Sequence, residues 1–539
     1  MIDILIDSNA IYTGVDGKPF AGSIKINDNI ITEVKKEKAS QSEINDAKRY
    51  IDLGDKMVLP GFSDAHIHYS TSALMVSGKI VNNLMDAKSA EECVSFVKEY
   101  LDENPNLKSI NGYGWFNSLW GDDSLPDKSI IDKLIPDKPV YLANIDGHAY
   151  WLNSKALEEC NITRDTEVSF GSIGKDENGE PNGLLFENEA TGLCLDKVVN
   201  FTDEELEESQ YLLLKEIASL GLTSVSDLAG NSVLTIENKI YSAAQKLLDD
   251  KKLTTRINFW PAMGLTGNFE EQKRLEKKYN SDMLRVCGVK QFVDGATSVY
   301  TACMLEPYED NPDTCGPSNY PADFYSEIIP KANKHGLSVR LHCIGDGAVR
   351  IALDGFEKSK KINDNYSELH NCMEHVESIS EKDIPRLKEL NVIASVQPCH
   401  LPIDENEKIS RIGKERCRYE WPFKSFDDIG VTMAFGTDAP MIIPNPFVNL
   451  HAAVTRCDTD GNPTGANPQE KISLECAINS YTLGSAISNG MEDKLGTLES
   501  GKLADITIIN NNLFEIDEND ILNSQVEMTI VDGKIVFEK

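Results

Sequence analysis

The 539-residue sequence is short of basic residues, with 53 Lys and Arg against 87 Asp and Glu and a formal net charge of −34 at pH 7. A polyanion repels the phosphates of nucleic acids and of anionic lipids, so neither is an expected partner. No uncharged apolar stretch approaches the roughly 18 residues of a spanning helix. The N-terminus, MIDILIDSNA, lacks a basic segment before an apolar run, so no signal peptide is expected.

The sequence also lacks two motifs that would define other chemistries. Its 12 cysteines are scattered from Cys93 to Cys476 and form no CxxC pair, which is typical of a reducing compartment, so we expect the cytoplasm. No G-x-S-x-G motif occurs, which argues against a serine hydrolase.

Short β-segments occupy both ends of the chain. A hairpin is expected where 23–26 and 30–34 flank the turn residues Asn27–Asn29, and another where 527–531 and 534–537 flank Asp532–Gly533. Because chain ends often lie close together, we predict one composite β-sandwich domain from residues 1–57 and 488–539.

The middle of the chain alternates apolar, β-branched runs with helical stretches, which predicts a parallel sheet buried on both faces. Eight such units predict an α/β fold, a (β/α)8 TIM-type barrel from residues 58–70 and 216–487. About 155 residues separate the first two runs, too many for one connection, so 71–215 are predicted to be an insertion domain over the barrel mouth. The runs are Val58–Asp64, Leu222–Asp227, Arg256–Pro261, Val286–Val293, Ser338–Ile344, Asn371–His375, Val392–Gln397 and Val431–Asp438.

Active sites of such barrels lie at the C-terminal ends of the strands, and these ends carry reactive side chains here. His66 and His68 follow the first run, and residues i and i+2 share one face of a strand, which favours joint metal binding. Later strand ends carry Lys290, His342, His375 and Asp438.

The presence of each of these residues can also be explained without metal binding. An HxH pair occurs by chance on surface strands, a buried histidine is often a hydrogen-bonded core residue, and Asp438 could cap the following helix. The sequence holds only nine histidines, however, and four of them fall on strand ends inferred from hydrophobic pattern alone. Their joint placement therefore favours a metal site.

This combination of strand-end residues resembles the amidohydrolase superfamily, and within it the YtcJ-like amidohydrolase-3 branch that includes N-substituted formamide deformylase. The stretches that carry the resemblance are Pro60–Phe62, Gly112–Trp115, Asp146–Ala149, Val289–Gly295, His342–Asp346, Gln397–Pro398, Gly436–Pro440, Gly496–Leu498 and Gly501–Asp505.

The resemblance implies roles for these positions. His66, His68 and Asp438 would bind the more buried metal, and His342 and His375 would bind a second one unless one of them turns to the substrate. Lys290 stands where many relatives carry a carboxylated lysine that bridges two metals; the alternative is an ordinary salt-bridged lysine. One or two Zn²⁺ ions are expected, and other divalent metals also suit these ligands.

The expected reaction is hydrolysis of a non-peptide C–N bond in a small amide, formamide or cyclic amide. Asp438 would take the proton from a metal-activated water, and His375 would stabilise the carbonyl oxygen. Three residues are candidates for substrate binding, namely His148, Trp115 and Gln397.

The alternatives are ester or phosphoester hydrolysis or isomerisation in the same barrel, or a non-catalytic homologue. A homodimer is common among such relatives and is a further expectation.

Overall fold

The computed structural model describes residues 1–121, 124–145, 147–168, 171–198, 200–228, 234–464 and 467–539. The chain forms two compact units. One contains Met1–Tyr69, Leu214–Leu228 and Leu248–Lys539, and the other contains Ser70–Leu213 and Ala229–Leu247. The candidate metal-binding residues all belong to the first unit.

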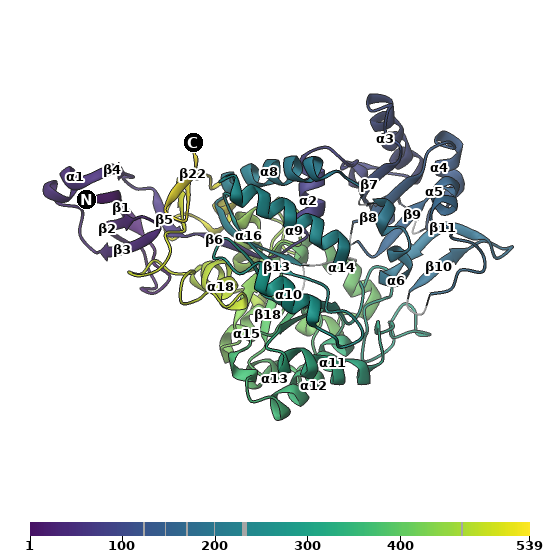
Figure 1. The fold of residues 1–539 in the computed structure, drawn as a ribbon. Coiled ribbons are helices and arrows are strands. Elements are labelled where there is room, and N and C mark those ends of the chain that lie inside the picture. The colour runs from purple at the N-terminus through teal and green to yellow at the C-terminus, as the bar shows by residue number, and fades with distance from the viewer. Residues whose placement is uncertain (122–123, 146, 169–170, 199, 229–233, 465–466) are drawn as a thin grey trace. The chain divides into compact units, whose positions relative to one another are not determined.

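Both chain ends contribute to one eight-stranded sheet in the first unit, as the purple and yellow strands of Figure 1 show. The central strand β1 pairs antiparallel with β2 and parallel with β4 and β5, and β5 pairs with β20 from the other end of the chain. Isoleucines such as Ile6, Ile24 and Ile506 fill its core. The strands are β1 (Ile2–Ile11), β2 (Phe20–Asn27), β3 (Ile30–Lys35), β4 (Ala47–Asp52), β5 (Met57–Pro60), β20 (Ile506–Ile509), β21 (Val526–Val531) and β22 (Lys534–Glu538).

Both expected hairpins are confirmed as β2–β3 and β21–β22. The first apolar run is divided, because Met57–Pro60 joins the terminal sheet and Phe62–Ile67 starts the parallel strands. The pairing gives one sheet, so a two-layered sandwich stays a prediction.

The remaining strands of the first unit are parallel, which confirms the expected α/β arrangement. One sheet has the order β14-β13-β12-β6 and the other β15-β16-β17-β18-β19. Over the described residues, no regular ladder joins the two sheets. Single parallel bridges link their edges, Ile67 to Ala439 and Ala262 to Lys290. The strands are β6 (Phe62–Ile67), β12 (Leu222–Leu228), β13 (Arg256–Trp260), β14 (Leu284–Val286), β15 (Gly288–Phe292), β16 (Ser338–Cys343), β17 (Cys372–His375), β18 (Ile393–Val396) and β19 (Met433–Phe435).

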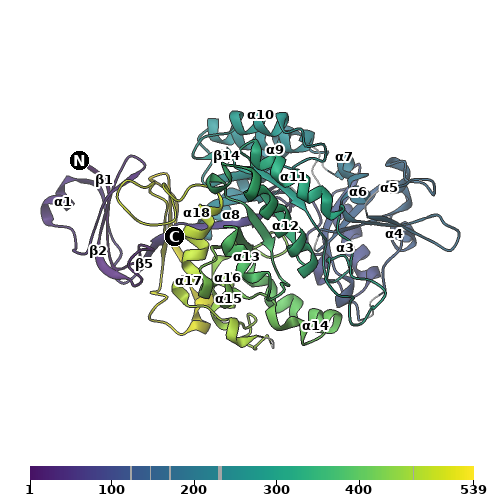
Figure 2. The same ribbon diagram turned by 90° about the horizontal axis from the view of Figure 1, so that it is seen from below.

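Helices follow most of these strands, and α11, α12 and α13 lie next to one another in Figure 1 and in the turned view of Figure 2. A single π-helical turn (Ser480–Gly484) separates α17 from α18 and packs on β19. The helices are α1 (Gln41–Asp46), α10 (Glu270–Lys278), α11 (Ala322–Lys334), α12 (Asp346–Ile362), α13 (Ile384–Glu389), α14 (Leu401–Ile412), α15 (Phe423–Ile429), α16 (Pro446–Thr455), α17 (Leu474–Asn479) and α18 (Ser485–Ser488).

The second unit has a five-stranded sheet of its own, in the order β10-β11-β9-β8-β7. Its core contains Trp115 and Trp151, which meet edge to face. Its strands are β7 (Ile110–Trp115), β8 (Val140–Asn144), β9 (Ala149–Leu152), β10 (Ser172–Lys175) and β11 (Pro181–Phe186). Its helices are α3 (Ala90–Glu103), α4 (Lys128–Leu134), α5 (Ser154–Glu159), α6 (Glu187–Gly192) and α7 (Leu195–Val198). The helices α2 (Tyr69–Val76), α8 (Asp203–Ser219) and α9 (Leu234–Asp249) each contain residues assigned to both units.

Among the described helices, none has the length and apolarity that crossing a bilayer requires.

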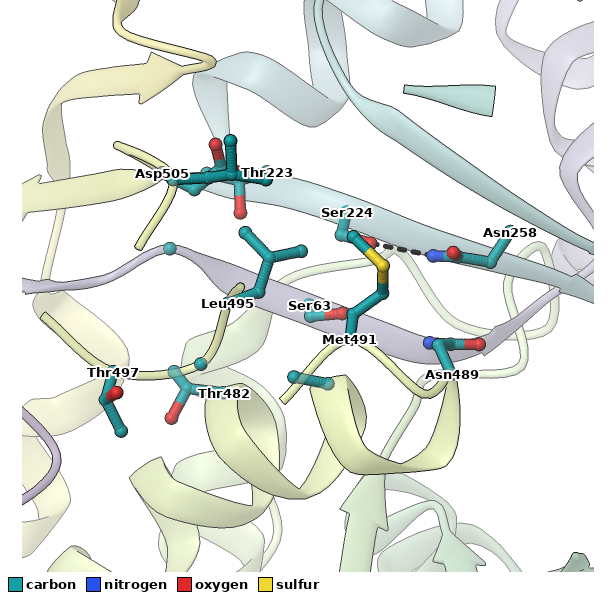
Figure 3. Close-up of a pocket in the computed structure, with 14 residues that line it drawn as sticks. Ser63, Thr223, Ser224, Asn258, Thr482, Asn489, Met491, Leu495, Thr497 and Asp505 are labelled. Carbon is teal, nitrogen blue, oxygen red and sulfur yellow. Dashed lines mark hydrogen bonds between the residues drawn. The ribbon is translucent and has the colours of Figure 1, made fainter. Parts of the chain in front are cut away.

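A polar cavity of about 10 Å³ lies among the N-terminal halves of the parallel strands. In Figure 3, Ser224 hydrogen-bonds Asn258, and Ser63 and Asn489 lie beside them. The space suits about one water molecule, so this end of the strands is packed rather than open.

A buried ion pair connects the parallel strands to the terminal sheet. Arg256 of β13, which is 1% exposed, makes two 2.8 Å hydrogen bonds to the carboxylate of Asp505 and one of 3.1 Å to Asp532. Removing one partner of such a pair leaves a buried charge uncompensated.

Asp505→Asn is therefore expected to destabilise the protein by about 3–5 kcal/mol. Differential scanning calorimetry would show a lower unfolding temperature. Asp102→Asn, which removes an exposed i,i+4 pair with Lys98, is the matched control and should change the transition little. Equal transitions for the two variants would contradict this role of Arg256.

Candidate metal centre

His66, His68 and Asp438 converge at the C-terminal ends of neighbouring strands β6 and β19. The Nε2 atoms of His66 and His68 lie 3.3 and 3.1 Å from Oδ1 of Asp438. The three residues form one of two clusters with metal-ligand spacing over the described residues. The structure thus brings together the three residues expected to bind the more buried metal.

Backbone geometry contributes to this convergence. Asp438 and His375 have φ angles of +58° and +71°, a left-handed conformation that non-glycine residues adopt at an energetic cost. At His375 it turns the chain as β17 ends. Gly436 is needed because a Cβ there would lie 2.6 Å from the His66 backbone nitrogen.

A buried carboxylate, Asp64, joins the two strands just below the three donors. It accepts hydrogen bonds from the backbone N–H groups of His66 and Thr437, at 3.0 and 3.1 Å, and from the hydroxyls of Thr437 and Tyr481, at 2.7 and 3.1 Å. Burial raises the pKa of Asp64 to about 7 despite these donors. This network fixes the residues adjacent to His66 and Asp438.

The second nitrogen of each histidine has a hydrogen-bond acceptor of its own. Nδ1 of His66 donates to Glu374 at 2.7 Å, and Nδ1 of His68 donates to the carbonyl of Leu228 at 3.1 Å. A neutral imidazole that donates through Nδ1 carries its lone pair on Nε2. With Nε2 unprotonated, two lone pairs and a carboxylate oxygen face one point, an arrangement that a divalent cation stabilises. A proton on His68 is the alternative, because Asp438 raises the pKa of His68 despite burial. This donor set fits a divalent metal ion.

The charge of Glu374 is held in place by Arg340, which is fully buried. Burial alone would raise the pKa of Glu374, but the Arg340 guanidinium and the hydrogen bond from His66 outweigh it and lower the pKa to about 2. Arg340 also donates to the carbonyl of Ala65 at 2.6 Å and to the hydroxyl of Ser488 at 2.8 Å. His66 thus rests on an ionised carboxylate that is itself fixed.

His342 and His375 lie beside this cluster, with 4.5 Å between their ring centroids and 5.0 Å from His375 to His66. Nδ1 of His342 is 3.1 Å from Asp294, whereas Nδ1 of His375 is buried without a hydrogen-bond partner among the described residues. Burial lowers the pKa of His375 well below its ordinary value, so this imidazole is neutral.

Lys290, on β15, is 2% exposed and its ammonium has no hydrogen-bond partner among the described residues. It lies 4.9 Å from the ring of Phe292. Burial lowers its pKa to about 8. Among the described residues, no carboxylate forms the ordinary salt bridge with Lys290 that the sequence left open, and its role as a carboxylated, metal-bridging lysine stays a prediction.

The three residues predicted to bind the substrate each lie close to a polar group of the protein. Gln397 is 2% exposed, with Nε2 3.4 Å from Nδ1 of His66. In the second unit, Nδ1 of His148 lies 3.0 Å from Glu187, and the Trp115 indole donates to the carbonyl of Leu142. A substrate-binding role for these three stays a prediction.

A second cluster with metal-ligand spacing consists of His375, Glu377 and His400, all buried. The sequence pattern predicted no role for Glu377 or His400, nor for Glu374, Arg340 and Asp294. Glu374 immediately precedes His375, and strand alternation turns adjacent residues to opposite faces, so the pattern did not place Glu374 at the site. Arg340 lies two residues before His342 and so shares its face, which is a signal that the sequence did contain. His375 has a left-handed backbone with φ +71°, and both residues contact His66: Glu374 accepts a hydrogen bond from Nδ1 of His66, and the ring centroid of His375 lies 5.0 Å from that of His66.

The chain matches the Amidohydrolase family over residues 49–537 and belongs to it. The resemblance drawn from the strand-end motifs is confirmed at the level of the family and of its YtcJ-like relatives.

Three relatives match nearly end to end. Protein LONG AFTER FAR-RED 3 of Arabidopsis thaliana is 29% identical over 99% of this chain and 91% of its own. Putative amidohydrolase YtcJ of Bacillus subtilis is 28% identical over 98% of both chains. N-substituted formamide deformylase of Arthrobacter pascens is 24% identical over 94% of this chain and 92% of its own.

Two solved structures share the fold. An uncharacterised metal-dependent hydrolase from Pyrococcus horikoshii superposes with a TM-score of 0.74 at 25% identity, covering 95% of this chain and 99% of its own. One from Pyrococcus furiosus gives 0.71 at 28% identity, covering 94% and 98%.

Glu374→Gln is expected to weaken metal binding about 10–100-fold, because an amide cannot serve as a charged acceptor for both His66 and Arg340. Competition with a chromophoric chelator measures the affinity. Glu368→Gln, at an exposed position, is the control. An unchanged affinity in a folded Glu374→Gln protein would show that this hydrogen bond does not tune the site.

Proposed function

We propose that this protein is a metal-dependent hydrolase that cleaves a non-peptide C–N bond in a small amide, formamide or cyclic amide. The observation that carries the proposal is the convergence of His66, His68 and Asp438 within 3.3 Å, each histidine oriented by an acceptor on its other nitrogen. Their geometry supports binding of a divalent ion, with Zn²⁺ the best match to two imidazoles and a carboxylate.

An ion bound there would lower the pKa of a water molecule toward neutrality and polarise a substrate carbonyl. Oδ1 of Asp438 lies 3.3 and 3.1 Å from the two histidine nitrogens, so this carboxylate is the group that would accept a proton from the attacking water. The same group then returns the proton to the departing nitrogen. Water adds to the carbonyl carbon, the C–N bond breaks, and the products are a carboxylic acid and an amine.

In this proposal, His375 would stabilise the carbonyl oxygen as it gains negative charge. Because this imidazole is neutral, it keeps a donor N–H near neutral pH without adding a charge to the crowded site. His342, oriented by Asp294, is the neighbouring candidate ligand.

Relatives support the C–N specificity. Arthrobacter pascens N-substituted formamide deformylase is named for cleaving a formamide, and it aligns over 94% of this chain. The amide substrate therefore rests on similarity, whereas metal binding rests on the geometry.

The wider architecture is part of the same proposal. We infer that the two parallel sheets close into one barrel through the bridges at Ile67–Ala439 and Ala262–Lys290. His148, Trp115 and Gln397 would then bind the substrate. We further propose a cytoplasmic homodimer that binds neither nucleic acid nor membrane.

Removal of metal tests the function. Dialysis against a strong chelator should abolish hydrolysis of N-substituted formamides, cyclic amides and simple amides, and added Zn²⁺ should restore it. Chromatographic identification of the amine and the acid separates this reaction from ester hydrolysis, phosphoester hydrolysis and isomerisation. Full metal content with no turnover of any amide would favour a different reaction, and a folded protein that binds no metal would favour a non-catalytic homologue.

Carboxylation of Lys290 has a pH dependence that can be measured. The pKa of about 8 means that the neutral, CO2-reactive amine increases as pH rises from 7 to 9. In ¹³C-bicarbonate, a ¹³C carbamate resonance should grow over this range and be absent from Lys290→Met. An unmodified Lys290 across the range would rule out the bridging role.

A further inference from the structure

The cluster of His375, Glu377 and His400 lies at the C-terminal ends of the adjacent strands β17 and β18. His375 ends β17, Glu377 follows two residues later, and His400 ends the short helical turn Pro398–His400 after β18. Their ligand atoms lie within 4.8 Å of one another, and the three residues are 4%, 4% and 2% exposed. The cluster shares no residue with His66, His68 and Asp438.

The two histidines are prepared to act as ligands. Nε2 of His400 lies 3.1 Å from the carbonyl oxygen of Thr437, which can only accept a hydrogen bond, so Nε2 is the donor and Nδ1 carries the lone pair. Ligand histidines ordinarily donate their other N–H to such an acceptor. Nδ1 of His375 is buried without a hydrogen-bond partner among the described residues, which is costly unless a ligand satisfies it.

Charge also favours a cation here. The buried ammonium of Lys408 pairs with Glu377 and, at 3.0 Å, with Glu420, so one positive charge faces two carboxylates. Lys408 additionally lies 4.2 Å from the ring of Trp421, which fixes it in place. A divalent ion on the Glu377 side would compensate the remaining negative charge.

We propose that His375, Glu377 and His400 bind a second divalent transition-metal ion, beside the ion bound by His66, His68 and Asp438. Two imidazoles and one carboxylate suit Zn²⁺, Co²⁺ or Mn²⁺ and leave coordination positions open. The proposal that a metal ion binds here depends only on the geometry of these three residues. Its role rests on the proposed function, because the ion would place positive charge where His375 faces the carbonyl oxygen.

This site competes with the expectation that His342, His375 and a carboxylated Lys290 hold the second metal. The two arrangements share only His375, so variants of their other residues separate them. Glu377→Gln and His400→Gln probe the new cluster, Lys290→Met probes the alternative, and Asp438→Asn probes the first site. His335→Gln and Glu389→Gln, both at exposed positions, are the matched controls.

Metal-free full-length protein would be equilibrated with excess Zn²⁺, passed through a desalting column and analysed for zinc per chain by mass spectrometry. Two ions per chain are expected in the wild type, the controls and Lys290→Met. One ion is expected in Glu377→Gln, His400→Gln and Asp438→Asn. Circular dichroism checks folding, and the Co²⁺ absorption spectrum of Asp438→Asn reports the second site by itself.

Two ions retained in both folded Glu377→Gln and His400→Gln would overturn the proposal, as would one ion in the wild type that these variants leave bound. Loss of the second ion in Lys290→Met alone would assign it to the lysine-bridged arrangement instead. Two ions with no amide hydrolysis would leave this site standing and contradict the proposed function, so the two failures are distinguishable.

Discussion

The buried contact between Arg340, Glu374 and His66 organises the parallel strands and the metal cluster together. Arg340 reaches the carbonyl of Ala65 on β6, the carboxylate of Glu374 on β17 and the hydroxyl of Ser488 after β19, and its guanidinium lies 4.3 Å from the ring of Trp260 on β13. A fully desolvated ion pair contributes little net stability, but it strongly disfavours any arrangement that separates its partners. The position of His66 is thereby tied to the packing of strands on both sheets.

The same principle recurs at the other histidines of the site. An imidazole has two nitrogens, and a fixed acceptor on one of them sets the direction of the lone pair on the other. Glu374, Asp294 and the carbonyls of Leu228 and Thr437 are these acceptors. His375 is different, since strained backbone positions it and its Nδ1 is left without a partner among the described residues. An orphaned buried nitrogen between two sets of donors is the feature that distinguishes a place for substrate or metal from ordinary core packing.

Much of this site could be predicted from the hydrophobic pattern of the sequence. Parallel strands buried on both faces read as apolar runs, and the ends of those runs located His66, His68, His342, His375 and Asp438 without knowledge of their contacts. The boundaries of the strands were harder to predict. The run from Val58 to Asp64 looked continuous, yet its first three residues pair with β20 from the far end of the chain. Hydrophobicity reports burial but does not identify the neighbour that provides it.

The sequence alone determined the family, the alternation of strands and helices, and the types of side chain available at the strand ends, because these depend on local periodicity and on motifs within a few residues. The tertiary structure decided which donors share a point. Glu377 and His400 lie 23 positions apart and belong to one cluster, while His342 lies 4.5 Å from His375 between ring centroids and is in neither cluster. Ligand geometry depends on atoms a few ångströms apart in space. The local sequence pattern does not determine that distance for residues that are far apart in the chain. The HxH pair was visible in the sequence, but the carboxylates and carbonyls that orient its lone pairs were supplied only by the fold.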